Sequence, residues 1–548
     1  MSGSDPSMPT ITLNGQELEF APGQTILQVA LDHEIEIPHY CYHPELTIVA
    51  NCRICLAQVW QPDPRQDGKL VEIPKLVPTC STEAIEGQVV SIESPKAIAS
   101  QKSVMEYLLI NHPVDCPVCD QAGECHLQDY SYQYGRGKSR FLEDKNKQPK
   151  KDLGEHVLLY SDRCIMCTRC VRFCREVTGT GELTIDGRGS TEQIDVFPGV
   201  ALDNPLSGNV IDICPVGALL DKDFLFQQRV WFLKKTPSID GLTASGDNIS
   251  VEHNDGRIYR VKPRRNDRIN KWWISDETRY GWHFIHGEDR VLMPRVAGVE
   301  PFAEEEAMLA FESAYEATNR LIRDAATRGH AGLMLSPMLS CEDAYSLIHW
   351  IRILDPNAVL CMGPVPVDGT DTTFPGGYTL RAEKAPNARG IRRVIDSVGG
   401  ATADSLDGCK AVVLTGNYPS TWVTPELAAS LADVPHVLMD TLEGPLMESA
   451  DVVIPTATWL EKSGSFVNAD GILQPFARAI DPINWCKSEY QVAADLLASL
   501  DGRLAPAVDM DQLRRTMASA SGLEEFADER FPELPAVQVE SDMELMEL

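Results

Sequence analysis

Cysteine spacing constrains the possible folds of this chain more than any other feature. Of its 16 cysteines, twelve lie between residues 41 and 214, and several are only two or three residues apart. A secreted disulfide scaffold is short and evenly cross-linked, whereas cysteines crowded at such spacing in an intracellular chain are typical of metal binding. We therefore expect metal ligands in this segment rather than disulfide bonds.

The first ligand set is Cys41-x10-Cys52-x2-Cys55-x24-Cys80. Around it the sequence predicts a hairpin over 11–20 that turns at Asn14-Gly15, a helix opened by Thr25, and a strand over 56–60. That order is typical of a small β-grasp domain. Four thiolates around a loop suit a [2Fe–2S] cluster. A four-thiolate zinc site is the alternative, although zinc ribbons usually contain two C-x2-C pairs and this set contains one.

The second ligand set is His112-x3-Cys116-x2-Cys119-x5-Cys125. A predicted helix over 95–110, with Val104, Tyr107 and Leu108 on one side, leads into it, and a polar, basic connector over 126–155 follows. Three thiolates and one imidazole could hold a structural zinc ion. A [4Fe–4S] cluster with one histidine ligand is the alternative. Because imidazole is neutral, it would lower the negative charge of such a cluster and alter its potential.

The third ligand set is Cys164-x2-Cys167-x2-Cys170 with a distant Cys214, which Pro215 follows. Three cysteines at this spacing can bind three corners of a cubane cluster, and a remote Cys-Pro supplies the fourth ligand in ferredoxin-like sites. Cys174 extends the run, but Arg175 follows it where a proline would be expected. We therefore expect Cys174 to be a buried bystander.

Three adjacent ligand sets indicate electron transfer. The sequence contains no G-x-G-x-x-G fingerprint after a strand, no Walker loop and no convincing nucleophile–base pair. A zinc-bound scaffold without a redox role is the competing interpretation. The net charge of −31 argues against nucleic-acid binding. No apolar run approaches the roughly 18 residues of a membrane span, and MSGSDPSMPT resembles neither a signal peptide nor a transit peptide, so we expect a soluble, bacterial-cytosolic chain.

Beyond residue 300 the pattern changes to alternating strands and helices. Short apolar strands are predicted at 332–336, 411–416 and 436–440, and helices at 341–354 and 424–432. Such alternation predicts an α/β domain built on a parallel sheet.

The order of the three sets resembles one family, the large iron–sulfur subunit (75 kDa subunit family) of NADH-quinone oxidoreductase, which is respiratory complex I. The resemblance covers about residues 10–290 and includes the segments DRCIMCTRCVRFCREV and IDICPVGAL. It implies that twelve residues bind iron: Cys41, Cys52, Cys55 and Cys80 one [2Fe–2S] cluster, His112, Cys116, Cys119 and Cys125 one [4Fe–4S] cluster, and Cys164, Cys167, Cys170 and Cys214 another.

The C-terminal part resembles a degenerate molybdopterin oxidoreductase, through the segment SADVVIPTATWLEKSGSFVNADGILQ at 449–474. The resemblance implies that this domain carries no molybdenum cofactor and is a structural remnant. Some family members bind a further [4Fe–4S] cluster after the third set. Because the matching positions offer no thiolate, we expect no fourth cluster here; they are Asp240, Thr243, Asp247 and Ser275.

The resemblance implies an electron-relay subunit of NADH:quinone oxidoreductase (EC 7.1.1 class), without NADH-binding or catalytic residues of its own. It would pass electrons from the flavin subunit towards quinone. Its partners would be the flavin/NADH-binding subunit, other iron–sulfur subunits and the membrane arm, which would hold it at the cytoplasmic side of the bacterial inner membrane. The alternative is the electron-transfer subunit of a soluble NAD-linked hydrogenase or formate dehydrogenase. The scattered C-terminal cysteines and the short C-terminal domain argue against it.

The expected fold is multidomain, of α+β and α/β class. The expected domains are a β-grasp [2Fe–2S] ferredoxin domain (1–94), a histidine/cysteine [4Fe–4S] domain (95–135), a ferredoxin-like [4Fe–4S] domain (136–225), a degenerate [4Fe–4S] domain without ligands (226–300), a molybdopterin-oxidoreductase-like α/β domain (301–520) and an acidic tail (521–548).

Overall fold

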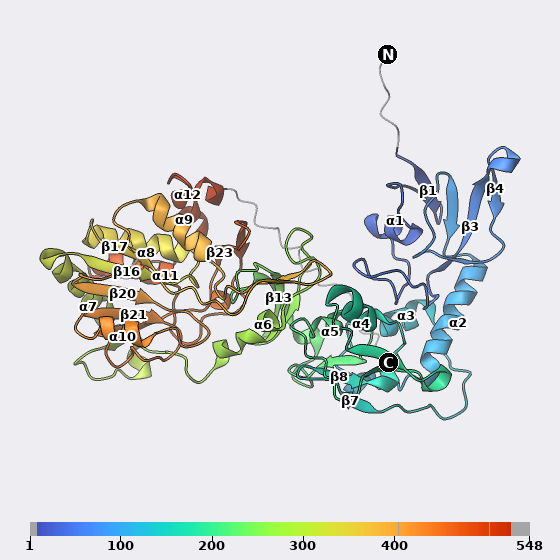
Figure 1. Ribbon diagram of the computed structural model, residues 1–548, viewed down its shortest axis with the longest axis horizontal. Coiled ribbons are helices and arrows are strands. Elements are labelled where there is room, and N and C mark those ends of the chain that lie inside the picture. Colours follow the sequence, from blue (N-terminus) through green and yellow to red (C-terminus); the bar gives the residue numbers. More distant parts are fainter. Residues whose placement is uncertain (1–7, 404, 504, 528–548) are drawn as a thin grey trace, which may run out of the picture. The chain divides into compact units, whose positions relative to one another are not determined.

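The computed structural model describes residues 8–403, 405–503 and 505–527, which form two compact units (Figure 1). One unit contains the residues up to 233 together with Phe374–Tyr378, and the other contains Lys234–Thr373 and the residues from 379 onward. The acidic tail expected over 521–548 lies outside the described residues from position 528 on. Within the described part, no helix has both the length and the apolar character that a membrane crossing requires.

The first unit begins with a small sheet and one helix. Their bounds are β1 (Thr10–Leu13), β2 (Gln16–Glu19), α1 (Ile26–Asp32), β3 (Leu56–Asp63), β4 (Lys69–Glu72), β5 (Val77–Pro78) and β6 (Gln88–Ser91). The sheet order is β2-β1-β6-β3-β4, and β5 pairs with β3. The predicted hairpin is confirmed, and so is the helix: the Thr25 hydroxyl accepts a hydrogen bond from the Gln28 amide in a capping box. The apolar face of α1 packs on the sheet.

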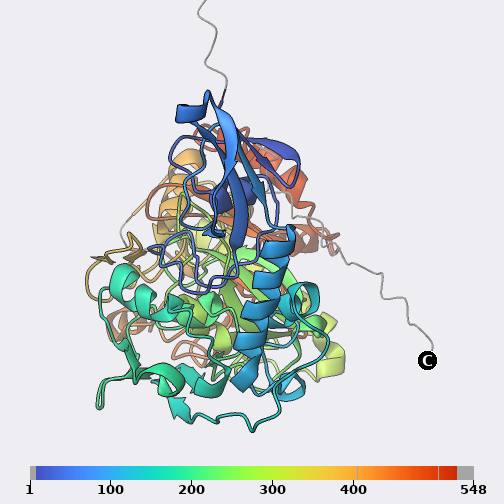
Figure 2. The ribbon, with the colours of Figure 1, turned by 90° about the vertical axis from the view of Figure 1, so that its right-hand side faces the viewer.

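The rest of the first unit is built from short elements. Their bounds are α2 (Pro95–Asn111), α3 (His126–Tyr134), β7 (Lys150–Asp152), β8 (Val157–Tyr160), α4 (Arg169–Arg172), β9 (Leu183–Asp186), β10 (Gln193–Val196), α5 (Asn209–Ile213) and β11 (Leu219–Asp221). The predicted helix α2 is confirmed and leads away from the N-terminal sheet (Figure 2). Its buried residues are Ala97, Gln101 and Met105, whereas Tyr107 is 72% exposed. The expected connector also contains α3.

The second unit begins with an antiparallel sheet and a short helix. The bounds are β12 (Lys234–Ile239), β13 (Asn248–Asn254), β14 (Arg257–Pro263) and α6 (Asp276–Tyr280). A distant hairpin completes this part, formed by β23 (Gly464–Val467) and β24 (Leu473–Phe476). The sheet and the hairpin share one apolar core that includes Trp282, Trp459 and Phe466.

A six-stranded sheet dominates the second unit. Its strands are β15 (Arg295–Val296), β16 (Ala331–Leu335), β17 (Val359–Met362), β20 (Ala411–Thr415), β21 (His436–Asp440) and β22 (Val452–Pro455). The order is β15-β22-β21-β20-β16-β17, and all strands but β15 are parallel, which confirms the predicted α/β domain. A separate small hairpin consists of β18 (Thr372–Thr373) and β19 (Thr379–Leu380).

Helices cover both faces of this sheet. They are α7 (Ala307–Arg328), α8 (Cys341–Leu354), α9 (Ala388–Val398), α10 (Pro425–Ser430), α11 (Glu489–Ser499) and α12 (Met510–Met517). Because side chains alternate along a strand, Leu333 and Val413 face the core under α7, α8 and α11, while Met334 and Val412 face the core under α10. Figure 1 shows α8 and α10 on opposite sides of the sheet.

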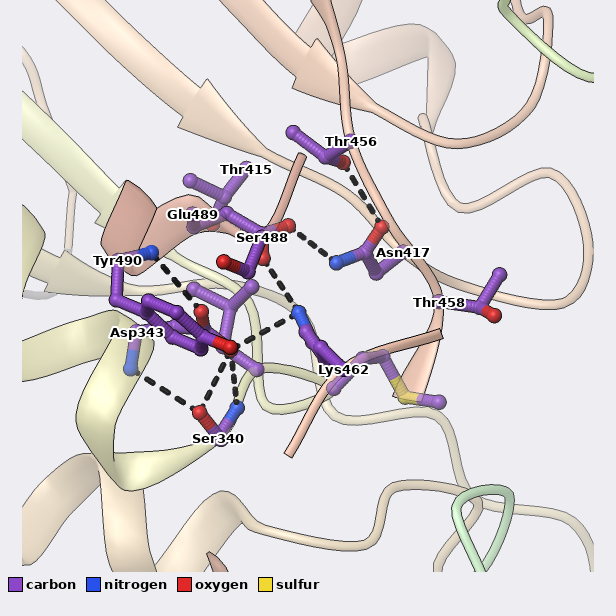
Figure 3. A network of polar contacts seen from close by, with 12 residues as sticks. Ser340, Asp343, Thr415, Asn417, Thr456, Thr458, Lys462, Ser488, Glu489 and Tyr490 are labelled. Carbon is purple, nitrogen blue, oxygen red and sulfur yellow. Dashed lines mark hydrogen bonds and ion pairs between the residues drawn. The ribbon is translucent and has the colours of Figure 1, made fainter. Parts of the chain in front are cut away.

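The parallel strands reverse their order between β16 and β20. In open α/β sheets of this kind, ligands bind outside the carboxyl ends of the strands at such a switch point. Here the two strand ends are tied directly, because the Ser336 amide donates to the Thr415 hydroxyl over 2.8 Å. Asn417, two residues beyond β20, donates to Glu489 and accepts from Thr456 (Figure 3).

A buried lysine holds the polar groups near this switch point together. Lys462 is 3% exposed, and its Nζ lies 2.9 Å from the Asp343 carboxylate and in contact with the Glu489 carboxylate (Figure 3). Although burial opposes its charge, the two carboxylates raise the pKa of Lys462 above its usual range. The chain's own side chains therefore occupy the position where related sheets bind a ligand.

Replacement of Lys462 by methionine should destabilise the second unit by roughly 3–5 kcal/mol, because two buried carboxylates would lose their cation. Hydrogen exchange of the β16 and β20 amides in urea measures this free energy of unfolding. The control is Arg503→Met, which breaks an exposed ion pair with Asp501 and should cost less than about 1 kcal/mol. Equal effects of the two substitutions would contradict the role of Lys462.

Candidate metal centres

The four thiols of the first set converge in the loop between α1 and β3 and just after β5. The Cys41 thiol is hydrogen-bonded to those of Cys52 and Cys80, and the Cys55 thiol is hydrogen-bonded to that of Cys80. These contacts lower the pKa of Cys41 to about 2 and that of Cys55 to about 7, and raise the pKa values of Cys52 and Cys80. The set is one connected group of sulfur atoms in which the thiols of Cys41 and Cys55 lose their protons more easily than those of Cys52 and Cys80.

All three ligand loops contain non-glycine residues in the left-handed backbone region. These are Ala50 and Arg53 in the first loop, with φ of 49° and 61°, Val114 in the second, with φ of 53°, and Met166 and Thr168 in the third, with φ of 52° and 63°. Each such residue costs roughly 1–3 kcal/mol, and they cluster at functional sites. Left-handed residues within a turn aim backbone N–H groups into one concavity, an arrangement that binds anions in phosphate and iron–sulfur sites.

The third set is buried around the start of α4. Burial raises the pKa of the Cys170 thiol, and the charges of Cys164, Cys167 and Cys214 raise it further, so all four sulfur atoms lie close together. The Met166 amide donates to Cys164 Sγ over 3.4 Å. Hydrogen bonds of this kind favour the thiolate form, which is the form that binds metals.

Cys174 acts on this group only weakly, since its charge raises the pKa of Cys170 by less than the charges of the other three cysteines do. Burial raises the pKa of its thiol to about 12, and the next largest contribution comes from the Glu182 carboxylate rather than from another cysteine. That Cys174 is a bystander stays a prediction.

The second set brings together three thiols and an unsatisfied imidazole. Burial raises the pKa of Cys119 and of Cys125, the latter to about 11, and the charge of Cys116 contributes to both. His112 follows the last residue of α2, and burial lowers its pKa to about 4, so the imidazole is neutral. Its Nδ1 is buried without a hydrogen-bond partner. His112 and Cys119 both lie in the field of the ion pair between Arg163 and Asp115.

The donor chemistry of the three sets fits iron–sulfur clusters. Eleven thiols and one imidazole provide soft sulfur and nitrogen ligands with no carboxylate among them. The orphaned Nδ1 of His112 is a neutral donor of the kind that metals bind. Within the described ranges, no three histidine, cysteine or acidic side chains are spaced to hold one single metal ion.

Two arginines of α4 join the first ligand loop to the third. The Arg172 guanidinium donates to the carbonyl oxygens of Cys41 over 2.5 Å and of Cys167 over 3.2 Å, so it binds a residue of each set. Arg169 donates to the carbonyl of Tyr42 over 2.5 Å and to that of Ile213, beside Cys214, over 3.2 Å.

The second set is joined to the third through the backbone. The amide of His126, which follows Cys125, donates to the carbonyl of Pro215 over 3.1 Å. Gly217 lies so close to the second set that a Cβ there would be 2.3 Å from Cys119 Sγ. Tyr40 is fully buried, and the charges of Cys52 and Cys125 both act on its phenol, so it lies between the first and second sets.

Polar side chains at the positions expected to lack a fourth cluster form hydrogen bonds with their neighbours. The Asp240 carboxylate accepts from the Thr243 and Ser245 hydroxyls over 2.5 and 3.0 Å, and burial raises its pKa. Ser275 caps α6 by accepting from the Thr278 amide. These oxygen atoms already take part in hydrogen bonds, and the sequence contains no cysteine in 233–283.

Sequence reasoning missed the arginines that hold these loops. Arg163, Arg169 and Arg172 are 2%, 6% and 5% exposed. A signal was present, because basic residues are interleaved with the cysteines in DRCIMCTRCVRF, but surface charge is the usual interpretation of such residues.

Comparison with protein families matches each ligand set to a separate model. The matches are a 2Fe-2S iron-sulfur cluster binding domain (7–95), the NADH-ubiquinone oxidoreductase-G iron-sulfur binding region (101–140), the NADH-quinone oxidoreductase subunit 3, ferredoxin-like domain (154–220), an NADH-ubiquinone oxidoreductase NDSU1/NuoG-like, 4Fe-4S domain (233–283) and molybdopterin oxidoreductase (442–499). The match over 233–283 contains no cysteine.

Curated relatives match between 50% and 57% of the chain. It is 40% identical over 319 residues to the mitochondrial NADH-ubiquinone oxidoreductase 78 kDa subunit of Neurospora crassa, covering 57% of this chain and 41% of that protein. It is 44% identical over 290 residues to the mitochondrial NADH dehydrogenase [ubiquinone] iron-sulfur protein 1 of Solanum tuberosum (53% and 38%). It is 39% identical over 275 residues to the G-type subunit of NADH-quinone oxidoreductase from Rickettsia bellii (50% and 39%).

The matched region thus spans about two fifths of each relative's length. Among solved structures, the chain matches the crystal structure of an NAD+-reducing [NiFe]-hydrogenase in the H2-reduced state, at 30% identity and a TM-score of 0.35. That match covers 40% of this chain and 91% of the other.

Replacement of Gly217 by alanine should abolish metal binding by the second set, because the new methyl group would overlap Cys119 Sγ. Metal analysis after anaerobic reconstitution measures the loss. Gly137→Ala is the matched control, since a Cβ there meets no atom within 4 Å. Full metal content in the Gly217 variant would show that Cys119 is not held where the structure places it.

Proposed function

Since the chain is a homologue of the large iron–sulfur subunit of NADH-quinone oxidoreductases, we propose that it relays electrons within such a complex. The observation that carries this proposal is the direct connection of three ligand sets. Arg172 binds backbone of the first and third sets, and the His126 amide binds Pro215 between the second and third.

The proposed ligands follow the three sets. A [2Fe–2S] cluster would be held by the first set and one [4Fe–4S] cluster by each of the others: the residues are Cys41, Cys52, Cys55 and Cys80, then His112, Cys116, Cys119 and Cys125, then Cys164, Cys167, Cys170 and Cys214. When bound, such clusters supply sites that accept and release one electron each. The residues of the chain bury the ligands, direct N–H groups at their sulfur atoms and fix the spacing of the loops.

We propose no fourth cluster and no molybdenum cofactor. The first absence is supported by the hydrogen bonds among Asp240, Thr243 and Ser245. The second is supported by Lys462 and its carboxylate partners, which occupy the switch point of the α/β sheet. The Asp240 region and the switch point both retain the fold of a binding site, but their polar side chains form hydrogen bonds or ion pairs with one another.

The proposed partners are a flavin/NADH-binding subunit as electron donor, other iron–sulfur subunits as acceptors and a membrane arm that reduces quinone. The names of the relatives, which are subunits of NADH-quinone and NADH-ubiquinone oxidoreductases, support this assignment. We propose a peripheral position on the cytoplasmic side of a bacterial inner membrane. With no nucleotide fingerprint in the sequence, NADH should reduce this chain only when the flavin subunit is present.

A reductive titration with matched cysteine variants tests the relay. The chain should accept about three electrons, one per cluster, and Cys170→Ala should lower this to about two by removing a ligand of the third set. Cys174→Ala should leave about three, because its thiol faces Glu182. Electron counts per chain are read from anaerobic dithionite titrations monitored by EPR.

Two results would contradict the proposal. A chain that accepts no electrons would not be a relay. A Cys174 variant that loses one electron while the Cys170 variant keeps all three would reverse the ligand assignment of the third set.

A further inference from the structure

We propose that Arg169 is the buried counter-charge shared by the first and third clusters, and that it raises the reduction potential of both. The inference rests on the proposed function, since it assigns a role to this residue toward clusters that the ligand sets would hold. It concerns a positioning and electrostatic residue that touches neither substrate nor electron donor.

Arg169 is a buried cation without a carboxylate partner among the described residues. Its side chain is 6% exposed, and its guanidinium donates only to the backbone carbonyls of Tyr42 and Ile213. Its Nε is buried and has no hydrogen-bond partner. In the described part of the chain, no carboxylate forms an ion pair with it. A buried charge in this situation is strongly unfavourable unless an anion lies nearby.

Arg163, in the same unit, is a buried arginine that does have a carboxylate partner. It is buried to a similar degree, but its Nη2 lies 2.5 Å from the Asp115 carboxylate. Arg172, one turn from Arg169, also lacks a carboxylate partner among the described residues and binds carbonyl and hydroxyl oxygens. The two α4 arginines therefore bring uncompensated positive charge between two ligand sets.

The groups near Arg169 indicate which anion would balance its charge. The thiols that act on its charge are Cys167 and Cys214 of the third set and Cys41 of the first. A cluster bound by four thiolates is anionic, and each reduction adds one more negative charge. A fixed cation between two such groups favours their reduced forms.

The test compares midpoint potentials in the full chain, measured by EPR-monitored redox titration. Arg169→Gln removes the charge and keeps an amide donor, so the ratio of reduced to oxidised cluster at a fixed potential should fall about tenfold for the first and third clusters. For a one-electron couple this equals about 59 mV. The second cluster, whose thiols are not among the largest influences on Arg169, should shift by less than half as much.

Two further variants separate charge from structure. Arg169→Lys keeps the charge and should hold both potentials near those of the unmodified chain. Arg175→Gln removes an exposed charge three residues beyond α4 and should change neither potential.

The inference fails if Arg169→Gln binds its clusters with unchanged potentials. It also fails if the lysine variant shifts as far as the glutamine variant or loses its clusters, because the retained charge would then make no difference. A chain that never binds iron would instead overturn the proposed function, and this result is seen before any variant is made.

Discussion

The guanidinium of Arg172 binds carbonyl oxygens of Cys41 and Cys167 and so joins two ligand loops of the first unit. Those two residues are far apart in the sequence and belong to different ligand sets. Neither loop could fix its distance from the other by backbone pairing, because both consist of turns without strand partners. One planar side chain with several donors solves this problem, since arginine can bind more than one carbonyl at once.

The first unit must also stabilise buried thiolates, which explains why so many polar groups are buried in its cysteine-rich region. Buried thiols resist ionisation, and the pKa of Cys170 is raised by burial and by its neighbours. Ligation requires thiolates, so the protein must supply compensating N–H groups and cations around them. Those N–H groups and cations come from the left-handed residues Met166 and Thr168 and from the arginines of α4. This role explains why the fold retains a strained backbone and buried charges at these positions.

The sequence predicted the elements well where local signals were strong. The Asn14-Gly15 turn, the Thr25 cap and the strands around 411–416 and 436–440 are present in the structure because each rests on turn chemistry, capping or an apolar run. The buried face of α2 could not be predicted, since helical period alone leaves the choice of face to the packing partner. The linking arginines and the Lys462 network could not be foreseen, because their partners lie up to about 130 residues away in sequence. The metal sets themselves were recognised from spacing, but their convergence depends on the tertiary fold.

The proposed relay requires that the three ligand sets hold three clusters and that no other cluster is present. Iron, acid-labile sulfide and zinc should be counted per chain on protein purified without oxygen. The account predicts about ten iron atoms, a matching number of sulfides and almost no zinc. About fourteen irons would mean that the Asp240 region binds a cluster despite its oxygen-only side chains. Zinc in place of iron, with little sulfide, would contradict the electron-transfer account as a whole.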